Sequence, residues 1–353
     1  MPGASGAVAA LDAPPAVSSP IGLARSGVVR HRGRSAVTSE ETLQEDALAG
    51  VATQGLVIEG LLAEGGMGAV YAARDLATDT PVALKVLRRE HAHDPGIVNR
   101  FTREVRFARR IDHPNVCPAL ADGRLEDGRP FYLMPLYEGV TLGDEVRRHG
   151  PLSTERALAI ADQLLAGLGA MHDARVVHRD LQPDNILLVP QAGGGVLVKL
   201  IDLGFAHEPG IDTGDGYTTD SPGALVGTLR FMSPEQALRS RAITERSDLF
   251  AVGLLLWFAL TGELPFRGSS DVDMLVSIVR AAPIPLRRRR ADAPRELEAI
   301  LTRALAKHPD ARFQSAAEMR SALTAVAERA GAAHPRAVCA LQRSSTRRTS
   351  RRR

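Results

Sequence analysis

Eight residues near the middle of the chain decide which fold the sequence can adopt: His178-Arg179-Asp180-Leu181-Gln182-Pro183-Asp184-Asn185. A second acidic motif, Asp202-Leu203-Gly204, begins 17 residues beyond Asn185. Between the two motifs, Ile186–Val189 and Val196–Ile201 have the composition of two strands joined across a glycine-rich turn. The pattern therefore predicts a β-hairpin with one polar motif at each end.

Upstream of this stretch, glycines gather in Ala63-Glu64-Gly65-Gly66-Met67-Gly68-Ala69-Val70. Glycine lets backbone N–H groups approach a phosphate more closely than a residue with a side chain does. A hairpin turn that binds no ligand explains the same glycines about equally well. Taken alone, the glycine cluster decides nothing.

A lysine and a glutamate on neighbouring elements add weight to a phosphate site. Lys85 lies in the third of three predicted strands (Leu56–Leu62, Ala69–Arg74 and Pro81–Arg88), and Glu104 follows 19 residues later on the predicted helix Ile97–Arg110. Such a pair can hold the α- and β-phosphates of ATP during phosphoryl transfer. The alternative is a surface lysine on an edge strand. Lys85 is, however, one of only three lysines beside 41 arginines, which indicates that a guanidinium is disfavoured there.

Together these motifs resemble those of the eukaryotic-like (Hanks-type) serine/threonine protein kinases of bacteria, over about residues 55–325. Gly227-Thr228 and Ser233-Pro234-Glu235 are similar to the end of that family's activation segment, Asp248 to its buried helix-start aspartate, and Arg312 to the partner of Glu235. The resemblance implies an α+β, bilobal protein kinase fold. Its small antiparallel β-rich N-lobe would hold one helix, and its larger C-lobe would be mainly helical.

The resemblance also implies roles in a transfer of the ATP γ-phosphoryl group to serine and threonine hydroxyls of proteins. Asp180 would accept the hydroxyl proton, while Asn185 and Asp202 would bind Mg²⁺, which prefers carboxylate and amide oxygens. The alternative for that pair is two buried polar residues that cap turns. The other catalytic residues would be Lys85, Glu104 and Gln182. The nucleotide would contact Leu62, Ala63, Gly65, Gly66, Gly68, Val70, Ala83, Lys85, Met134, Pro135, Tyr137 and Leu187.

Three positions depart from the family pattern. Ala63 stands in place of the first glycine of the loop, and Leu203 replaces a more common phenylalanine. Gln182 stands where these kinases carry a lysine that meets the γ-phosphate. Losing one charge-assisted contact of ~1.5–3 kcal/mol slows a reaction roughly 10- to 100-fold. We therefore expect an active but slow kinase, the alternative being a pseudokinase that serves as a nucleotide-binding scaffold or interaction module.

Regulation is predicted in the segment between Gly204 and Thr228. In the family, the arginine at the position of Arg179 pairs with a phosphate on the activation loop. Autophosphorylation is therefore expected at Thr218, Thr219 or Ser221, the alternative being a simple flexible loop. Thr228 resembles the threonine that marks serine/threonine rather than tyrosine substrates.

Composition divides the 353 residues into three parts. Residues 1–53 lack aromatic side chains and sustained periodicity, which predicts a disordered leader. Residues 54–330 would form the kinase domain, with an N-lobe over 54–138 and a C-lobe over 139–330. The tail 331–353 holds seven arginines and no acidic residue, so the rest of the chain sums to −4 although the formal net charge is +3.

The sequence predicts a cytoplasmic protein. The longest apolar run, Leu249–Thr261, is shorter than the ~20 residues that cross a bilayer, so we expect a buried helix and no integral membrane segment. Neither a signal peptide nor a disulfide framework is expected, because the start lacks a cationic region and the chain has only two cysteines. Nucleic-acid binding is not expected, since the basic charge belongs to the tail, whose partner, if it has one, would be acidic.

Overall fold

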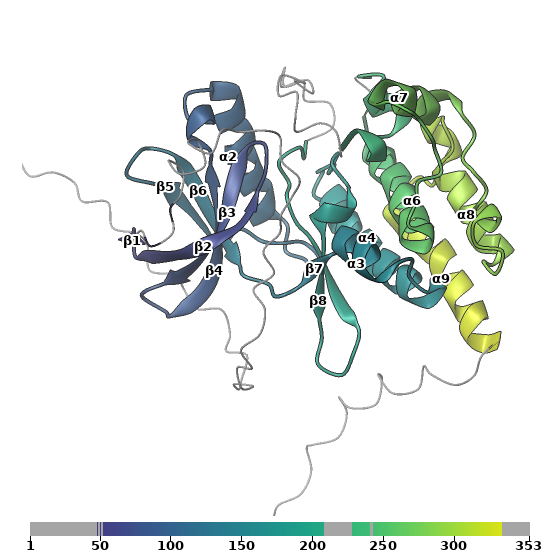
Figure 1. Cartoon of the computed structure of the whole chain (residues 1–353), viewed down its shortest axis with the longest axis horizontal. Coiled ribbons are helices and arrows are strands. Elements are labelled where there is room, and N and C mark those ends of the chain that lie inside the picture. The colour runs from purple at the N-terminus through teal and green to yellow at the C-terminus, as the bar shows by residue number, and fades with distance from the viewer. Residues whose placement is uncertain (1–47, 49, 51, 208–227, 241–242, 334–353) are drawn as a thin grey trace, which may run out of the picture. The chain divides into compact units, whose positions relative to one another are not determined.

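The computed structural model describes residues 48, 50, 52–207, 228–240 and 243–333. A six-stranded sheet forms first, in the order β1-β2-β3-β4-β6-β5 (Figure 1). Its strands are β1 (Ala52–Thr53), β2 (Leu56–Glu64), β3 (Gly68–Asp75), β4 (Thr80–Leu87), β5 (Ala121–Arg124) and β6 (Pro130–Pro135). All neighbouring strands run antiparallel, as the three predicted strands and their short turns imply.

One face of this sheet carries the N-lobe core. Alternate side chains of β2 and β3 are buried, among them Ile58, Tyr71 and Ala73, and they pack with Leu84 of β4 and Phe131 of β6. This alternation is the period of a strand with one covered face. The register places Lys85 opposite Val70 on one side and Tyr132 on the other, so the sheet fixes the position of the lysine.

Helix α2 (Pro95–Arg110) is the one α-helix of the described N-lobe residues. Asp94 caps its start by accepting hydrogen bonds from the N–H groups of Gly96 and Ile97, and proline occupies the first turn. Apolar residues at helical spacing, including Phe101 and Val105, bury one face. Glu104 lies on the same buried face, so its carboxylate is in the protein interior.

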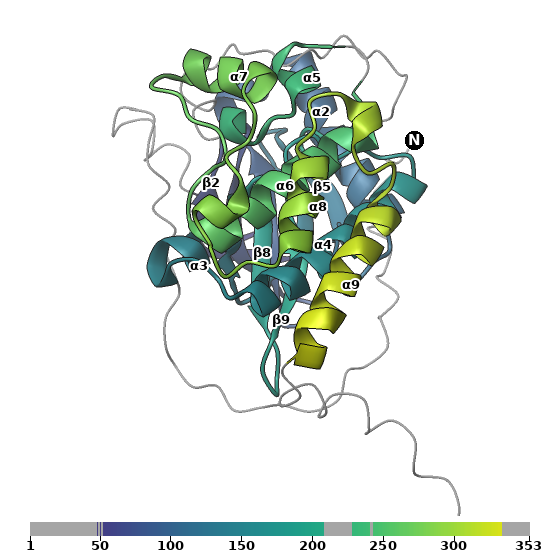
Figure 2. The ribbon, with the colours of Figure 1, turned by 90° about the vertical axis from the view of Figure 1, so that its right-hand side faces the viewer.

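The C-lobe is mainly helical. Its α-helices are α3 (Leu142–His149), α4 (Thr154–Asp173), α5 (Pro234–Ala237), α6 (Glu245–Thr261), α7 (Asp271–Arg280), α8 (Arg295–Ala304) and α9 (Ala316–Ala333). Helix α4 contacts α6 and α9, and α8 contacts α6 and α9 (Figure 2). A small sheet of β7 (Val140–Thr141), β8 (Ile186–Pro190) and β9 (Val196–Leu200) adjoins α4.

The apolar run Leu249–Thr261 is the buried helix that its length predicts. Residues Leu249 to Trp257 of α6 are all buried, and Gly262 ends the helix in the left-handed region at φ 72°. Among the described residues, no helix is both long and apolar enough to span a membrane.

The bilobal α+β fold is confirmed. Strand β1 (Ala52–Thr53) pairs with β2, and Leu48 packs against the N-lobe core, although both lie in the predicted leader 1–53. Helix α9 continues to Ala333, past the predicted domain end at residue 330. The division into leader, kinase domain and tail stays a prediction. The rest of the leader and tail lie outside the described residues.

Candidate active site

Lys85 joins the two lobes through a pair of carboxylates. Its Nζ donates to Glu104 Oε1 at 2.7 Å and to Asp202 Oδ1 at 3.1 Å. Burial alone would lower the pKa of Lys85, but attraction to Asp202 and Glu104 outweighs burial and raises it. The amine is therefore held charged at the point where the two lobes meet, as a cation that binds phosphates must be.

Glu104 receives a second hydrogen bond that the sequence did not predict. The Tyr132 hydroxyl donates to Glu104 Oε1 at 2.7 Å, and the Tyr132 ring contacts Phe101 with centroids 5.6 Å apart. Glu104 is only 1% exposed. A carboxylate so deeply buried requires such donors, and they fix the side of α2 that faces Lys85.

Asp180 and Asn185 form a compact polar pair. Asn185 Nδ2 donates to the Asp180 carbonyl at 2.9 Å and to Asp180 Oδ2 at 3.0 Å, while Gln182 Nε2 lies 3.4 Å from the same Oδ2. Asp180 Oδ1 is buried and has no hydrogen-bond partner in the described part of the chain. Burial, reinforced by the Asp202 charge, raises the pKa of Asp180 to about 7. This carboxylate can therefore accept a hydroxyl hydrogen at Oδ1.

Two site residues adopt a backbone conformation that favours glycine. Arg179 has φ 67° and Asp202 has φ 64°. Asp248 holds the first of them: its Oδ2 accepts from His178 N and its Oδ1 from Arg179 N, each at 2.9 Å. His172 Nε2 lies 2.9 Å from Asp248 Oδ2 and helps to keep the Asp248 carboxylate in this position. Packing thus sustains an otherwise costly conformation beside Asp180.

The glycine loop folds back on itself and reaches the second acidic motif. Gly65 N donates to Gly68 O at 2.9 Å, and a Cβ at Gly68 would lie 2.6 Å from the carbonyl oxygen of Val86. A Cβ at Gly204 would lie 2.6 Å from Met67 Cε. Gly68 is therefore required by the close approach of the Val86 backbone, whereas the flexible Met67 side chain could move away from a Cβ at position 204. Met67 thus links the loop to the turn after Asp202.

The predicted nucleotide contacts are divided between the two sheets. Ala83 of β4 pairs with Met134 of β6, and Val82 pairs with Pro135. The remaining predicted contacts lie on the glycine hairpin (Leu62, Ala63, Gly65, Gly66, Gly68 and Val70), after β6 (Tyr137) and on β8 (Leu187). Tyr137 carries the ammonium of Lys199 over its ring at 4.7 Å.

The donor set fits magnesium held with the help of phosphate oxygens. Asn185 directs its Nδ2 to Asp180, which leaves its amide oxygen for a ligand, and Asp202 Oδ1 already accepts from Lys85 and Gly204 N. The Asp202 side chain is 40% exposed, so its other oxygen is accessible. The described residues contain no group of three or more His, Cys, Asp and Glu that could hold a metal. Mg²⁺ accepts such a sparse set, because it usually binds one or two carboxylates together with phosphates and waters.

A comparison with known protein families matches residues 56–323 to the protein kinase domain. The chain belongs to this family. The match covers every strand of the first sheet except β1, the helical lobe as far as residue 323, and every predicted catalytic residue. Together with the bacterial serine/threonine kinases described next, it confirms the resemblance that the motifs indicate.

Curated serine/threonine kinases of bacteria are similar to this kinase domain. It is 38% identical over 284 residues to "Serine/threonine-protein kinase PknB" of Mycolicibacterium smegmatis, covering 80% of this chain and 44% of that protein. It is 40% identical over 265 residues to "Serine/threonine-protein kinase pkn3" of Myxococcus xanthus, covering 74% and 48%. The chain thus spans less than half the length of these curated relatives. The crystal structure of the Mycobacterium tuberculosis PknI kinase domain (C20A_R136A double mutant) superimposes with a TM-score of 0.60 at 25% identity, covering 79% of this chain and 98% of that one.

The kinase domain contains the buried pair that the sequence predicts at the end of the activation segment. Arg312 Nη1 and Nη2 donate to Glu235 Oε1 and Oε2, each at 2.8 Å, and Arg312 is 0% exposed. Ser247 donates to the same carboxylate at 2.5 Å. Gln236 Nε2 also donates to the Arg179 carbonyl at 2.6 Å, a link from α5 to the catalytic stretch that no motif indicated.

The predicted regulatory residues are only partly described. Thr218, Thr219 and Ser221 lie outside the described residues, so their phosphorylation stays a prediction. Thr228 begins a 3₁₀ helix, Thr228–Phe231, directly before α5. Arg179 lies between Asp248, which binds its N–H, and Gln236, which binds its carbonyl.

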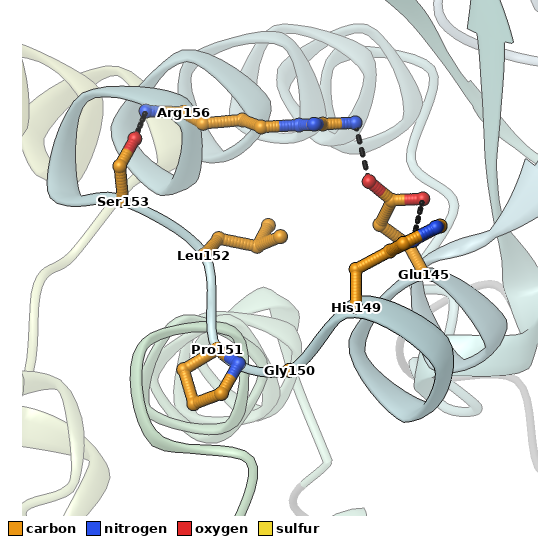
Figure 3. A pocket seen from close by; sticks show the side chains of 7 residues that line it. All are labelled: Glu145, His149, Gly150, Pro151, Leu152, Ser153 and Arg156. Carbon is orange, nitrogen blue, oxygen red and sulfur yellow. Dashed lines mark hydrogen bonds and ion pairs between the residues drawn. The ribbon is translucent and has the colours of Figure 1, made fainter.

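A cavity of about 520 Å³ lies where α3 meets α4, lined by Glu145, His149, Gly150, Pro151, Leu152, Ser153 and Arg156 (Figure 3). Arg156 and His149 both reach the Glu145 carboxylate, at 2.6 and 3.2 Å, and Ser153 accepts from Arg156 N. Its charged groups are therefore satisfied by one another. None of the predicted catalytic residues lines this cavity.

Proposed function

We propose that this chain is a serine/threonine protein kinase that transfers the γ-phosphoryl group of ATP to protein hydroxyls. The observation that carries the proposal is the position of Lys85 Nζ, 2.7 Å from Glu104 and 3.1 Å from Asp202. One cation thereby links α2 of the N-lobe to the turn that follows the β8–β9 hairpin of the C-lobe. Phosphoryl transfer depends on such charge placement, because it needs little covalent chemistry from the protein.

Each group then has a role that fits its geometry. Lys85 binds the α- and β-phosphates, with Glu104 orienting it. Asn185 and Asp202 hold Mg²⁺, which neutralises charge on the phosphates when bound. Asp180 orients the substrate hydroxyl through Oδ1 and accepts its proton. The glycine hairpin covers the phosphates, and the β4–β6 edge with Leu187 receives the adenine.

Gln182 is the residue that raises the choice between an active but slow kinase and a pseudokinase. Its Nε2 lies 3.4 Å from Asp180 Oδ2, so a neutral amide stands where an ammonium would assist the transferring phosphate. The complete set of Lys85, Asp180, Asn185 and Asp202 favours a working but slow enzyme over a pseudokinase.

The experiment is transfer of ³²P from γ-labelled Mg-ATP to a generic basic protein, followed by phosphoamino-acid analysis. The Asp180→Asn variant is the matched control, because it preserves the shape of the side chain. Phosphoserine or phosphothreonine above that control supports the proposal. A wild-type signal equal to the control rejects it and favours the pseudokinase, and phosphotyrosine alone rejects the substrate class.

Autophosphorylation of Thr218, Thr219 or Ser221 belongs to the same proposal. The position of Arg179 supports it, since both of its backbone groups are anchored beside Asp180. We place the enzyme in the cytoplasm, where ATP is abundant, and assign it to signalling. Phosphosite mapping by mass spectrometry after incubation with ATP tests the modification, and unmodified peptides from residues 208–227 would reject it.

A further inference from the structure

A second cavity, of about 430 Å³, lies between α2 and the β5–β6 edge of the N-lobe sheet. Its lining includes Phe101 and Val105 of α2, and Phe131 of β6. These three residues belong to the buried cores, at 1%, 7% and 4% exposure. The cavity therefore has an apolar floor that an aliphatic side chain could cover.

The rim of this cavity is basic. Arg106 and Arg109 contribute from α2 and Arg124 from β5, and all three are exposed. Asp122 pairs with Arg109 at 2.6 Å, so two arginine charges remain uncompensated on the rim. Within the described residues, no ion pair joins Arg106 or Arg124 to an acidic side chain. An apolar floor under such a rim fits a segment that combines acidic residues with one aliphatic side chain.

The floor connects directly to the catalytic ion pair. Phe101 contacts the Tyr132 ring at 5.6 Å, and the Tyr132 hydroxyl donates to Glu104 at 2.7 Å. Val105 is the immediate neighbour of Glu104 on the same helix. An occupant of the cavity would therefore press on the face of α2 that sets the distance between Glu104 and Lys85.

The chain supplies a segment of matching chemistry close by. Residues 39–46, Ser-Glu-Glu-Thr-Leu-Gln-Glu-Asp, contain four acidic residues around Leu43. Leu48, only two residues further on, packs against the core cluster that contains Phe131 and Leu125. Gln54 donates to the carbonyl of Arg124 itself. At ~3.5 Å per residue, every position in 39–46 lies within about 32 Å of Leu48 along the chain.

We propose that residues 39–46 dock in the α2–β5 cavity, with Leu43 over its floor and the acidic residues on its arginine rim. The docked segment braces α2, and with it Glu104, in the position that pairs with Lys85. This regulatory role rests on the proposed kinase function, whereas the docking itself does not.

Photocrosslinking in the full chain tests the docking without requiring activity. With p-benzoylphenylalanine in place of Leu43, irradiation is expected to yield intramolecular crosslinks to peptides within residues 101–131. The Arg106→Glu/Arg124→Glu variant should lower their yield about tenfold, because two contacts become repulsive. The matched control, Arg287→Glu/Arg288→Glu, reverses two exposed arginines of the C-lobe and should leave the yield unchanged.

Other outcomes overturn the docking. These are an unchanged yield in the rim variant, crosslinks outside residues 101–131, or a product found only at twice the monomer mass, which would place the segment on a second copy. To distinguish lost docking from misfolding, Glu40→Arg/Glu41→Arg is added to the rim variant. Restored crosslinking supports the proposal, and failure to restore it counts against it.

The regulatory step has its own readout. Neutralising the segment (Glu40→Gln, Glu41→Gln, Glu45→Gln and Asp46→Asn) should slow ³²P transfer about 3- to 10-fold, in line with a coupling of ~1 kcal/mol. If the segment crosslinks to the cavity but the neutralised variant transfers ³²P as fast as wild type, the bracing role is wrong. A wild-type chain that transfers nothing would reject the kinase proposal, while the crosslink map would still decide the docking.

Discussion

The Tyr132 hydroxyl donates to Glu104 Oε1 at 2.7 Å, the same oxygen that accepts from Lys85. The tyrosine thus holds in place the carboxylate that orients the phosphate-binding cation. Both partners are almost fully buried, at 4% and 1% exposure. Removing one donor leaves a buried charge with less compensation.

Tyr132→Phe should therefore slow phosphoryl transfer about tenfold, the equivalent of ~1.4 kcal/mol. The ring contact with Phe101 survives this change, so the unfolding temperature should fall only slightly. Steady-state kinetics and thermal unfolding of the variant check both points. Equal kcat/KM for wild type and variant would show that the hydroxyl does not position Glu104.

Replacing the neutral amide near Asp180 should accelerate the enzyme. We expect Gln182→Lys to raise kcat roughly 10- to 100-fold, because an ammonium stabilises developing negative charge by ~1.5–3 kcal/mol. Gln182→Met, of similar length and without polarity, is the matched control and should not accelerate transfer. Initial rates at saturating Mg-ATP measure the effect, and an unchanged or lower rate for the lysine variant would contradict this role for position 182.

Breaking the buried Glu235–Arg312 pair should destabilise the C-lobe. Arg312 also donates to the carbonyls of Ala306, Arg246 and Lys307, so Arg312→Met removes a hydrogen-bond donor from these three carbonyls and from both oxygens of Glu235. We expect a loss of about 3–5 kcal/mol in the free energy of unfolding. The double variant with Glu235→Leu should lose clearly less than the two single losses combined. Additive losses in urea titrations would mean that the pair contributes no coupling.

Asp248 should make stability depend on pH in the acid range. Burial alone would raise its pKa, but the hydrogen bond and charge of His172, aided by His178, outweigh burial and lower it. A carboxyl with a lowered folded pKa stabilises the fold above its unfolded pKa and loses that contribution as pH falls through the folded value. The stability difference between wild type and Asp248→Asn should therefore shrink as the pH falls below about 4. Urea titrations at several pH values measure this difference in the free energy of unfolding. A difference that grows as the pH falls would contradict a lowered pKa for Asp248.

The features that could be predicted from the sequence are those that depend on residues close together in the chain. The strand of Lys85, the helix of Glu104 and the hairpin between Asn185 and Asp202 follow from local periodicity and turn residues. Three residues were missed, Tyr132, His172 and Gln236, whose partners lie 28, 76 and 57 residues away. A tyrosine in a strand, a histidine near a helix end and a glutamine in a capping box all have ordinary local roles. Only the tertiary contact shows that they support the site.

The ends of the domain were hard to place for a related reason. Ala52–Thr53 is too short to show a period of two, and its pairing with β2 comes from the turn at Gln54 and Gly55. Strand β5 (Ala121–Arg124) contains none of the β-branched or aromatic residues that mark a strand. It exists because β6 offers an unpaired edge.

The most direct test of the central claim is whether Lys85 and Asp202 act together on one bound triphosphate. Transfer of ³²P from γ-labelled Mg-ATP is measured for wild type, Lys85→Met, Asp202→Asn and the double variant. We expect each single change to reduce the rate by at least about 100-fold, and the double variant to be no slower than the worse single one, because groups that work as a unit are non-additive. Wild-type transfer by Lys85→Met, or losses that multiply in the double variant, would contradict the account.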